Sequence, residues 1–320
     1  MPESQRKATF VRPGDGAYLA WFGERVRYLA VGEQTEGRMS VAVETIAPGG
    51  GSIPHIRHRE HTAYYVVSGE VLFAVGKRSL SLSADAFVCI APGTAQKFTN
   101  AGQSPAELLV ISAPAGFEEL RFRAGLPLAS ADQPRPAASN EDHETLAAIA
   151  PGFGIELHPT SGFQQEPAMR VTMPLEGKMT AFVGDLYRFL AVSDDTGGRF
   201  AVFHATVGPG GGPPFHIHSR EDEAFFVLDG TVSFDSEDAS IELGPGGFVH
   251  LPIGTKHRFA NAMQEPAEVL IIVSPAGFEK YFELAGQPWH DATQRPGPPD
   301  QAEIDRLIAS APQFGLEVIV

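Results

Sequence analysis

The chain has 320 residues, of which 43% are hydrophobic, and this is enough for two domains that each bury a core. Its formal net charge of -15 argues against nucleic acid as a partner, because there is no surplus of basic residues to displace counterions. No apolar run approaches the roughly 18 residues of a membrane span, and the first residues contain no apolar signal core, so we expect a soluble cytoplasmic protein. The single cysteine, Cys89, excludes an intramolecular disulfide and fits a reducing compartment.

The sequence contains an internal repeat, in which one unit occurs twice along the chain. The run RYLAV at Arg27 to Val31 is echoed by RFLAV at Arg188 to Val192, an offset of 188 - 27 = 161 residues. The same offset relates four further pairs, which are Gly49 and Gly210, Gly69 and Gly230, Asn100 and Asn261, and Pro114 and Pro275. A repeat held over this length indicates a duplicated domain. We predict two tandem domains, residues 1–163 and 164–320.

Each copy is a series of short segments rich in β-branched and aromatic residues, separated by Gly, Pro or Asp. Many short strands at close spacing predict an all-β fold, an antiparallel sandwich or barrel. In the second copy the expected strands are Phe200 to Val207, Glu223 to Leu228, Thr231 to Phe234, Ser240 to Leu243, Phe248 to Leu251 and Val269 to Val273.

Helical periodicity is confined to the end of each copy. Between Gln301 and Ala311, apolar residues recur at i, i+3, i+4 and i+7, and Asp300 and Glu303 are placed as a capping pair. Glu141 to Ala150 is a weaker counterpart in the first copy. Each barrel is therefore expected to be followed by a short helix.

Four side chains in the second copy have the composition of a metal site. His216 and His218 alternate along one predicted strand and so share a face, Glu223 begins the next strand, and His257 follows a Gly/Pro turn. Imidazole and carboxylate ligands together suit Fe, Mn, Co, Ni, Cu or Zn, and the ligand types do not identify which of these metals is bound.

At these residues the sequence resembles the cupin superfamily, whose two motifs are G-x5-H-x-H-x3-4-E-x6-G and G-x5-P-x-G-x2-H-x3-N. The second copy matches every defined position, which are Gly210, His216, His218, Glu223, Gly230, Gly246, Pro252, Gly254, His257 and Asn261. The resemblance implies two tandem jelly-roll β-barrels with short C-terminal helices. It also makes His216, His218, Glu223 and His257 the ligands of one divalent transition metal in the C-terminal barrel.

The first copy departs from these motifs. Subtracting 161 places His55, Arg57, Thr62 and Gln96 at the four ligand positions, so that one ligand of four survives. Because arginine does not lose its proton to bind a metal, we expect a metal-free first barrel in which Arg57 pairs with an acidic group or an anionic ligand. The neighbouring residues His58, Arg59, Glu60 and His61 are interpreted as solvated surface.

The remaining histidines and aromatic residues indicate structure rather than chemistry. His204 and His250 lie in expected strands, and we interpret them as structural or surface residues. Five phenylalanines of the second copy are expected in its core, although an aromatic-rich barrel mouth would also suit a flat ligand. These are Phe203, Phe215, Phe225, Phe226 and Phe248.

Among two-barrel cupins, the chain is most similar to the quercetinase-type dioxygenases. The similarity rests on the length of the barrels, the three-histidine and glutamate site, and the PAGFE segment that leads into a helix and a proline-rich loop after each barrel. It implies a metal-dependent dioxygenase that cleaves a ring or C–C bond of an aromatic or enolic, flavonol-like small molecule with O2. Glu223 is then both ligand and general base.

Two other functions are compatible with the same ligands. A non-oxidative cyclase or isomerase would use the metal as a Lewis acid, and a ligand-binding or sensor protein would use it structurally. The expected partners are a small-molecule substrate and O2, and apolar strands such as Val269 to Val273 are compatible with a homodimer.

Overall fold

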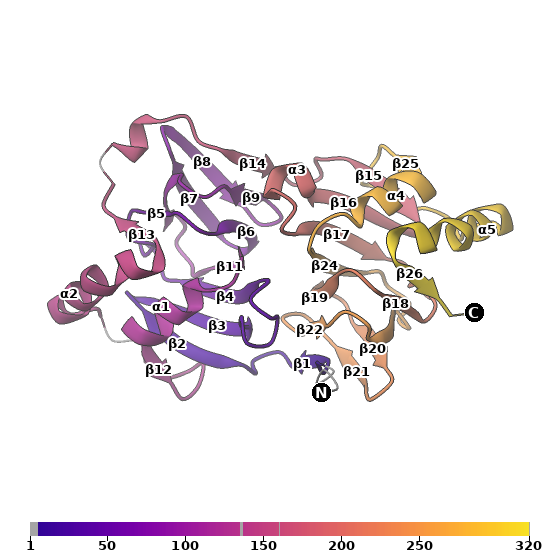
Figure 1. Cartoon of the computed structure of the whole chain (residues 1–320), viewed down its shortest axis with the longest axis horizontal. Helices are drawn as coiled ribbons and strands as arrows, with labels where there is room; N and C mark the ends of the chain where they lie inside the picture. Colours follow the sequence, from indigo (N-terminus) through magenta and orange to yellow (C-terminus); the bar gives the residue numbers. More distant parts are fainter. Residues whose placement is uncertain (1–5, 135–136, 160, 320) are drawn as a thin grey trace. The chain divides into compact units, whose positions relative to one another are not determined.

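A computed structural model of the chain describes residues 6–134, 137–159 and 161–319 (Figure 1). Its contacts group the described residues into two compact units. The first unit spans Gly16–Pro174, and the second spans the chain from Leu175 together with the N-terminal segment that ends at Asp15. Strand β14 (Met169–Thr172), which follows the expected boundary at 163/164, pairs with β9 (Phe87–Ile90) of the first unit.

Each unit consists of an eight-stranded and a five-stranded antiparallel sheet, as expected for a jelly roll. In the first unit the larger sheet has, in spatial order, β12 (Leu126–Leu128), β2 (Ala17–Trp21), β3 (Glu24–Ala30), β4 (Ser40–Ile46), β11 (Ala106–Ala113), β6 (His61–Ser68), β9 and β14. The smaller sheet has β13 (Ile155–Leu157), β5 (His55–Arg57), β10 (Ala95–Asn100), β7 (Glu70–Val75) and β8 (Arg78–Ser83).

The second unit repeats this architecture. Its larger sheet has β1 (Thr9–Val11), β22 (Phe248–Leu251), β19 (Asp222–Asp229), β24 (Ala267–Ser274), β17 (Ala201–Val207), β16 (Asp185–Ala191), β15 (Met179–Phe182) and β25 (Gln287–Trp289). Its smaller sheet has β21 (Ser240–Leu243), β20 (Val232–Ser236), β23 (Lys256–Ala260), β18 (His216–His218) and β26 (Leu316–Val318). The all-β prediction is confirmed.

One of the two edge strands of each larger sheet comes from the start of a repeat. β1 pairs with β22 of the second unit, and β14, which lies 161 residues further along, pairs with β9 of the first. β24 lies inside its sheet, between β19 and β17, and its residues Val269 to Val273 are buried. They therefore offer no free edge, and a homodimer stays a prediction that this strand does not support.

Short helices follow each barrel, as predicted. The first unit has α1 (Phe117–Ala124), α2 (Asn140–Ile149) and 3-10 turns at Ala150–Phe153 and Gly162–Gln164. The second has α3 (Ser193–Thr196), α4 (Glu279–Ala285), α5 (Gln301–Ser310) and a 3-10 turn at Ala311–Phe314. Half of the predicted capping pair of α5 is confirmed, because the Asp300 side chain accepts a hydrogen bond of 2.8 Å from the Glu303 backbone N–H. The Glu303 carboxylate instead accepts a hydrogen bond of 3.0 Å from the Gln287 side chain. In the part of the chain that the structure describes, no helix is long and apolar enough to span a membrane.

The interior of the second unit is an aromatic and aliphatic cluster between its two sheets. Phe225 and Val227 point into it from β19, in the same direction as Glu223, as strand alternation requires. The Phe225 ring lies 5.2 Å from that of Phe234 and 5.1 Å from that of Phe259. Phe203 also lies in this cluster, Phe226 and Phe248 are buried outside it, and Phe215 is only partly buried, so that four of the five phenylalanines are confirmed as core residues.

Candidate metal centre

The four expected ligands come together inside the second unit. β18 carries His216 and His218, and it pairs with β23 so that His216 lies directly opposite His257. Glu223 enters from β19 in the other sheet. The site therefore lies between the two sheets, where strand alternation turns all four side chains inward.

One carboxylate oxygen is the centre of this cluster. Oε2 of Glu223 lies 2.9 Å from Nε2 of His257, 3.5 Å from Nε2 of His218 and 4.0 Å from Nε2 of His216. One donor atom from each of the four residues lies within 4.8 Å of the others, and each residue is at most 6% exposed. Three imidazole nitrogens and one carboxylate oxygen at this spacing fit a first-row divalent metal.

Backbone carbonyls orient two of the imidazoles. Nδ1 of His216 lies 2.9 Å from the carbonyl oxygen of Pro214, and Nδ1 of His257 lies 2.9 Å from that of Thr255. A carbonyl only accepts hydrogen bonds, so Nδ1 of each ring carries a proton and Nε2 is the nitrogen that the ring turns toward the centre.

The electrostatics of the cluster favour a deprotonated donor set. Burial, together with the neighbouring His257, lowers the pKa of His216 to about 4 although Glu223 opposes the change, so that its ring is neutral at physiological pH. Burial alone would raise the pKa of Glu223, but the neighbouring imidazoles of His218, His216 and His257 outweigh it and hold that pKa well below its ordinary value. A neutral imidazole beside a carboxylate is the state that binds a cation.

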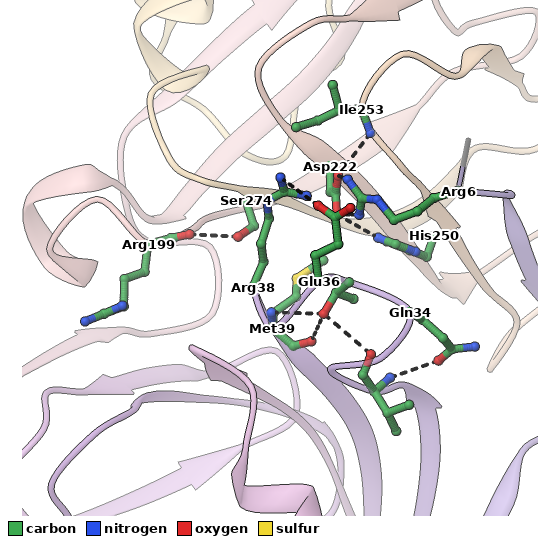
Figure 2. A network of polar contacts seen from close by, with 12 residues as sticks. Arg6, Gln34, Glu36, Arg38, Met39, Arg199, Asp222, His250, Ile253 and Ser274 are labelled. Carbon is green, nitrogen blue, oxygen red and sulfur yellow. Dashed lines mark hydrogen bonds and ion pairs between the residues drawn. The ribbon is translucent and has the colours of Figure 1, made fainter. Parts of the chain in front are cut away.

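A second polar network anchors the start of β19 (Figure 2). Asp222, next to Glu223 but on the opposite face, forms a paired contact with Arg6 at 2.6 and 2.9 Å and lies 3.2 Å from Nε2 of His250. It also accepts the backbone N–H of Ile253 at 3.0 Å, in the turn that leads to His257. His250 is fully buried and His204 lies 3.5 Å from Glu268, so their structural interpretation holds.

The last residue of the second motif is structural. Asn261 is fully buried, its amide group donates at 2.9 Å to the carbonyl oxygens of Val207 and Glu265, and its Oδ1 accepts the N–H of Met263. Asn100 has the same three bonds in the first unit. We predict that Asn261→Ala lowers the free energy of unfolding by about 2–3 kcal/mol, because it leaves buried backbone groups without partners. Urea unfolding measures this, and metal content per folded chain should stay unchanged; a loss of metal at full stability would contradict the structural role.

Beside the candidate ligands lies a cavity of about 270 Å³. Its walls are mostly apolar and come from β15, β16, the PAGFE segment, α4 and α5. The residues that line it include Phe182, Tyr187, Phe278, Tyr281, Phe282 and Leu307. The sequence reasoning missed these residues, because it singled out five other phenylalanines and expected those in the core; the repeated PAGFE segment is the one sequence signal that contains a wall residue, Phe278.

In the first unit, a guanidinium occupies the corresponding place. Nε of Arg57 donates to Nε2 of His55 at 3.3 Å, an Nη donates to Ser112 Oγ at 3.0 Å, and the group lies 3.6 Å from the centre of the Phe117 ring. The side-chain oxygen of Gln96 accepts a hydrogen bond of 2.9 Å from the Tyr64 hydroxyl. A metal-free first unit stays a prediction, which this arrangement supports.

One expectation about the first unit was wrong. Glu60, interpreted as solvated surface, is 3% exposed. Burial raises the pKa of its carboxyl and the charge of nearby Arg57 opposes the rise, so Glu60 lies close enough to Arg57 for the two groups to interact. His58 is half-exposed and lies 3.3 Å from Glu156.

Comparisons with known proteins agree with this architecture. The cupin domain family matches residues 42–112 and 203–273, two segments that start 203 - 42 = 161 residues apart. The chain is 24% identical over 324 residues to quercetin 2,3-dioxygenase of Bacillus subtilis strain 168, and the alignment covers 97% of this chain and 94% of that enzyme.

Solved structures show the same fold at lower identity. Oxalate decarboxylase of Lactobacillus farciminis matches with a TM-score of 0.55 and 14% identity, over 82% of this chain and 85% of that one. AerE from Microcystis aeruginosa matches with a TM-score of 0.53 and 12% identity, over 83% and 98%. Each half of the chain therefore carries a cupin domain.

Proposed function

We propose that the chain is a metal-dependent dioxygenase that cleaves a C–C bond of an aromatic, enolic small molecule such as a flavonol. The observation that carries the proposal is the opening of the His216, His218 and Glu223 side chains onto an aromatic-lined cavity of about 270 Å³. The similarity to a quercetin 2,3-dioxygenase over nearly the whole chain supports the same reaction class.

The candidate ligands have two roles, metal binding and proton transfer. A bound divalent metal would supply Lewis acidity toward an enolic oxygen and a redox route to dioxygen. His216, His218 and His257 would hold it through Nε2, together with Glu223. Because the pKa of Glu223 is held well below its ordinary value, its carboxylate is ionised when the substrate arrives, and Oε2 can take the enol proton. Both atoms of O2 enter the product, and no external reductant is consumed.

The cavity walls favour a flat substrate. The Phe282 ring is stacked on Tyr187 at 4.7 Å and edge-on to Phe182 at 4.7 Å, so these three packed rings form an aromatic wall that suits a planar ligand. Helix α5 closes one side through Leu307, and the Tyr281 hydroxyl of α4 ties the helix in place by donating to the Leu307 carbonyl at 2.9 Å.

Oxygen consumption tests the proposed function. Protein loaded separately with Fe, Mn, Co, Ni, Cu or Zn is offered quercetin and other aromatic enols in an oxygen electrode. We expect uptake of one O2 per substrate consumed with at least one metal. Product formation under strict anaerobiosis would instead identify a cyclase or isomerase, and no turnover with any metal across the panel would contradict an enzymatic role.

The Tyr187 hydroxyl is available to a substrate. Tyr187 lines the cavity, and none of the described residues is hydrogen-bonded to its hydroxyl. Burial, with the charges of Asp185 and Glu223, raises the pKa of this phenol well above its ordinary value, so that it stays a donor.

We predict that Tyr187→Phe lowers kcat/KM about five- to tenfold for a substrate with an oxygen in reach, the value of one neutral hydrogen bond of about 1 kcal/mol. Steady-state kinetics measure this. Tyr64→Phe is the matched control, because it removes a buried phenol of the first unit, and it should leave kcat/KM unchanged. Equal kinetics of Tyr187→Phe and the unsubstituted enzyme would mean that the hydroxyl does not meet the substrate.

A further inference from the structure

His218 differs from the other two imidazoles in what lies behind it. Whereas Nδ1 of His216 and of His257 each faces a backbone carbonyl, Nδ1 of His218 lies 3.5 Å from Oε2 of Glu221. Both side chains are at most 5% exposed, and within the described residues neither of these two atoms has a hydrogen-bond partner. Two buried polar atoms that face each other at this distance form a hydrogen bond after a small rotation of the ring.

The surroundings of His218 fix the ring in the direction of Glu221. The Phe278 ring packs edge-on against the imidazole with centroids 4.6 Å apart. The carbonyl of His218 accepts the N–H of Gly254 at 2.8 Å, which ties β18 to the turn before His257. The backbone and one face of the ring are therefore held, and the carboxylate is the group that selects which nitrogen carries the proton.

The first unit contains the same three-part arrangement around a permanent cation. Subtracting 161 from 218, 221 and 278 gives Arg57, Glu60 and Phe117. Arg57 lies over the Phe117 ring at 3.6 Å, and its charge acts on the buried Glu60. The acid is thus present in both copies, and in the first copy, which has only one of the four ligand residues, it lies near a positive group at the position of His218.

We propose that Glu221 is a positioning residue that holds His218 as the Nδ1-protonated tautomer and makes its Nε2 a stronger donor than those of the other two histidines. A carboxylate behind a ligating imidazole draws the Nδ1 proton toward itself and increases the electron density on Nε2, more than a neutral carbonyl does. The metal centre is then electronically unequal, with its most basic imidazole on the side of Phe278. This inference rests on the proposed metal site.

Metal affinity and the signals of the ring protons test the proposal. Co(II) affinity is measured by competition with a chelator for the unsubstituted protein, Glu221→Gln, Glu221→Ala and the control Glu60→Gln. We expect a loss of about tenfold for Glu221→Gln and up to about a hundredfold for Glu221→Ala, the range known for such supporting groups. Glu60→Gln removes the equivalent acid from the first unit and should leave the affinity unchanged.

Proton NMR of the Co(II)-loaded protein provides a readout that a purely structural role would not change. Three exchangeable, paramagnetically shifted Nδ1–H signals are expected in the unsubstituted protein. Gln keeps an acceptor, so in Glu221→Gln all three persist and the signal from His218 moves; in Glu221→Ala that proton exchanges rapidly and its signal is lost. Circular dichroism before metal loading verifies that each variant is folded. If Glu221→Ala is not folded, Glu221→Gln alone tests the proposal.

The outcomes separate this inference from the proposed metal site. If the unsubstituted protein binds Co(II) and both Glu221 variants keep its affinity and its three signals, the role of Glu221 is wrong and the metal site stands. If the unsubstituted protein binds neither Co(II) nor any other divalent transition metal, the metal site is wrong and the role of Glu221 falls with it.

Discussion

Glu223→Gln is expected to lower kcat/KM for the oxygen-consuming reaction by about 10²–10⁴-fold, the usual contribution of a positioned general base. Glutamine preserves the shape of the side chain but has no charge, so it neither accepts the enol proton nor balances a divalent cation. The structural reason is that Oε2 of Glu223 is the point on which all three Nε2 atoms converge. Oxygen uptake measures the loss.

The matched control for this substitution is Thr62→Val. Thr62 holds the position of Glu223 in the first unit, it is fully buried, and within the described residues its hydroxyl has no hydrogen-bond partner. Valine has nearly the same volume, so kcat/KM should not change. A Glu223→Gln enzyme that keeps a tenth or more of the activity would show that another group accepts the proton.

Restoring the lost ligands should create a second metal site. We predict that Arg57→His, Thr62→Glu and Gln96→His together raise the metal content from about one to about two ions per chain. The scaffold is already present: Nδ1 of His55 lies 2.8 Å from the carbonyl oxygen of Ile53, as His216 lies from Pro214, and Gln96 pairs directly opposite His55, as His257 does opposite His216. Elemental analysis of the folded triple variant gives the result.

The control for the second site uses apolar residues at the same positions. Arg57→Met, Thr62→Val and Gln96→Leu remove the same three side chains but supply no donor atoms, so the content should stay at about one ion per chain. If the histidine and glutamate variant also stays at one while circular dichroism shows it folded, the two units differ in more than their ligands.

Much of the fold was predictable because the repeat and strand alternation are both visible in sequence. The expected segments Ser240 to Leu243 and Phe248 to Leu251 coincide with β21 and β22, and the predicted cap at Asp300 is present. The convergence of the four candidate ligands followed from alternation along β18 and the motif spacing.

The remainder depends on contacts that leave no local pattern. β1 has three residues and pairs with β22, which lies more than two hundred residues away, so periodicity gives no sign of it. The cavity wall draws Tyr187 from a strand and Phe282 from a helix, and both look like ordinary core residues in sequence. Glu221 and Glu60 were missed for the opposite reason, because a charged residue in a polar run is normally exposed.

The central claim is that the second unit holds the chain's metal centre and the first unit holds none. Elemental analysis of the purified protein beside His218→Ala tests it most directly, with His204→Ala as a control for a buried histidine outside the cluster. We expect about one transition-metal ion per chain in the unsubstituted protein and in His204→Ala, and less than about a tenth in His218→Ala. Two ions per chain, or one that survives in His218→Ala, would contradict it.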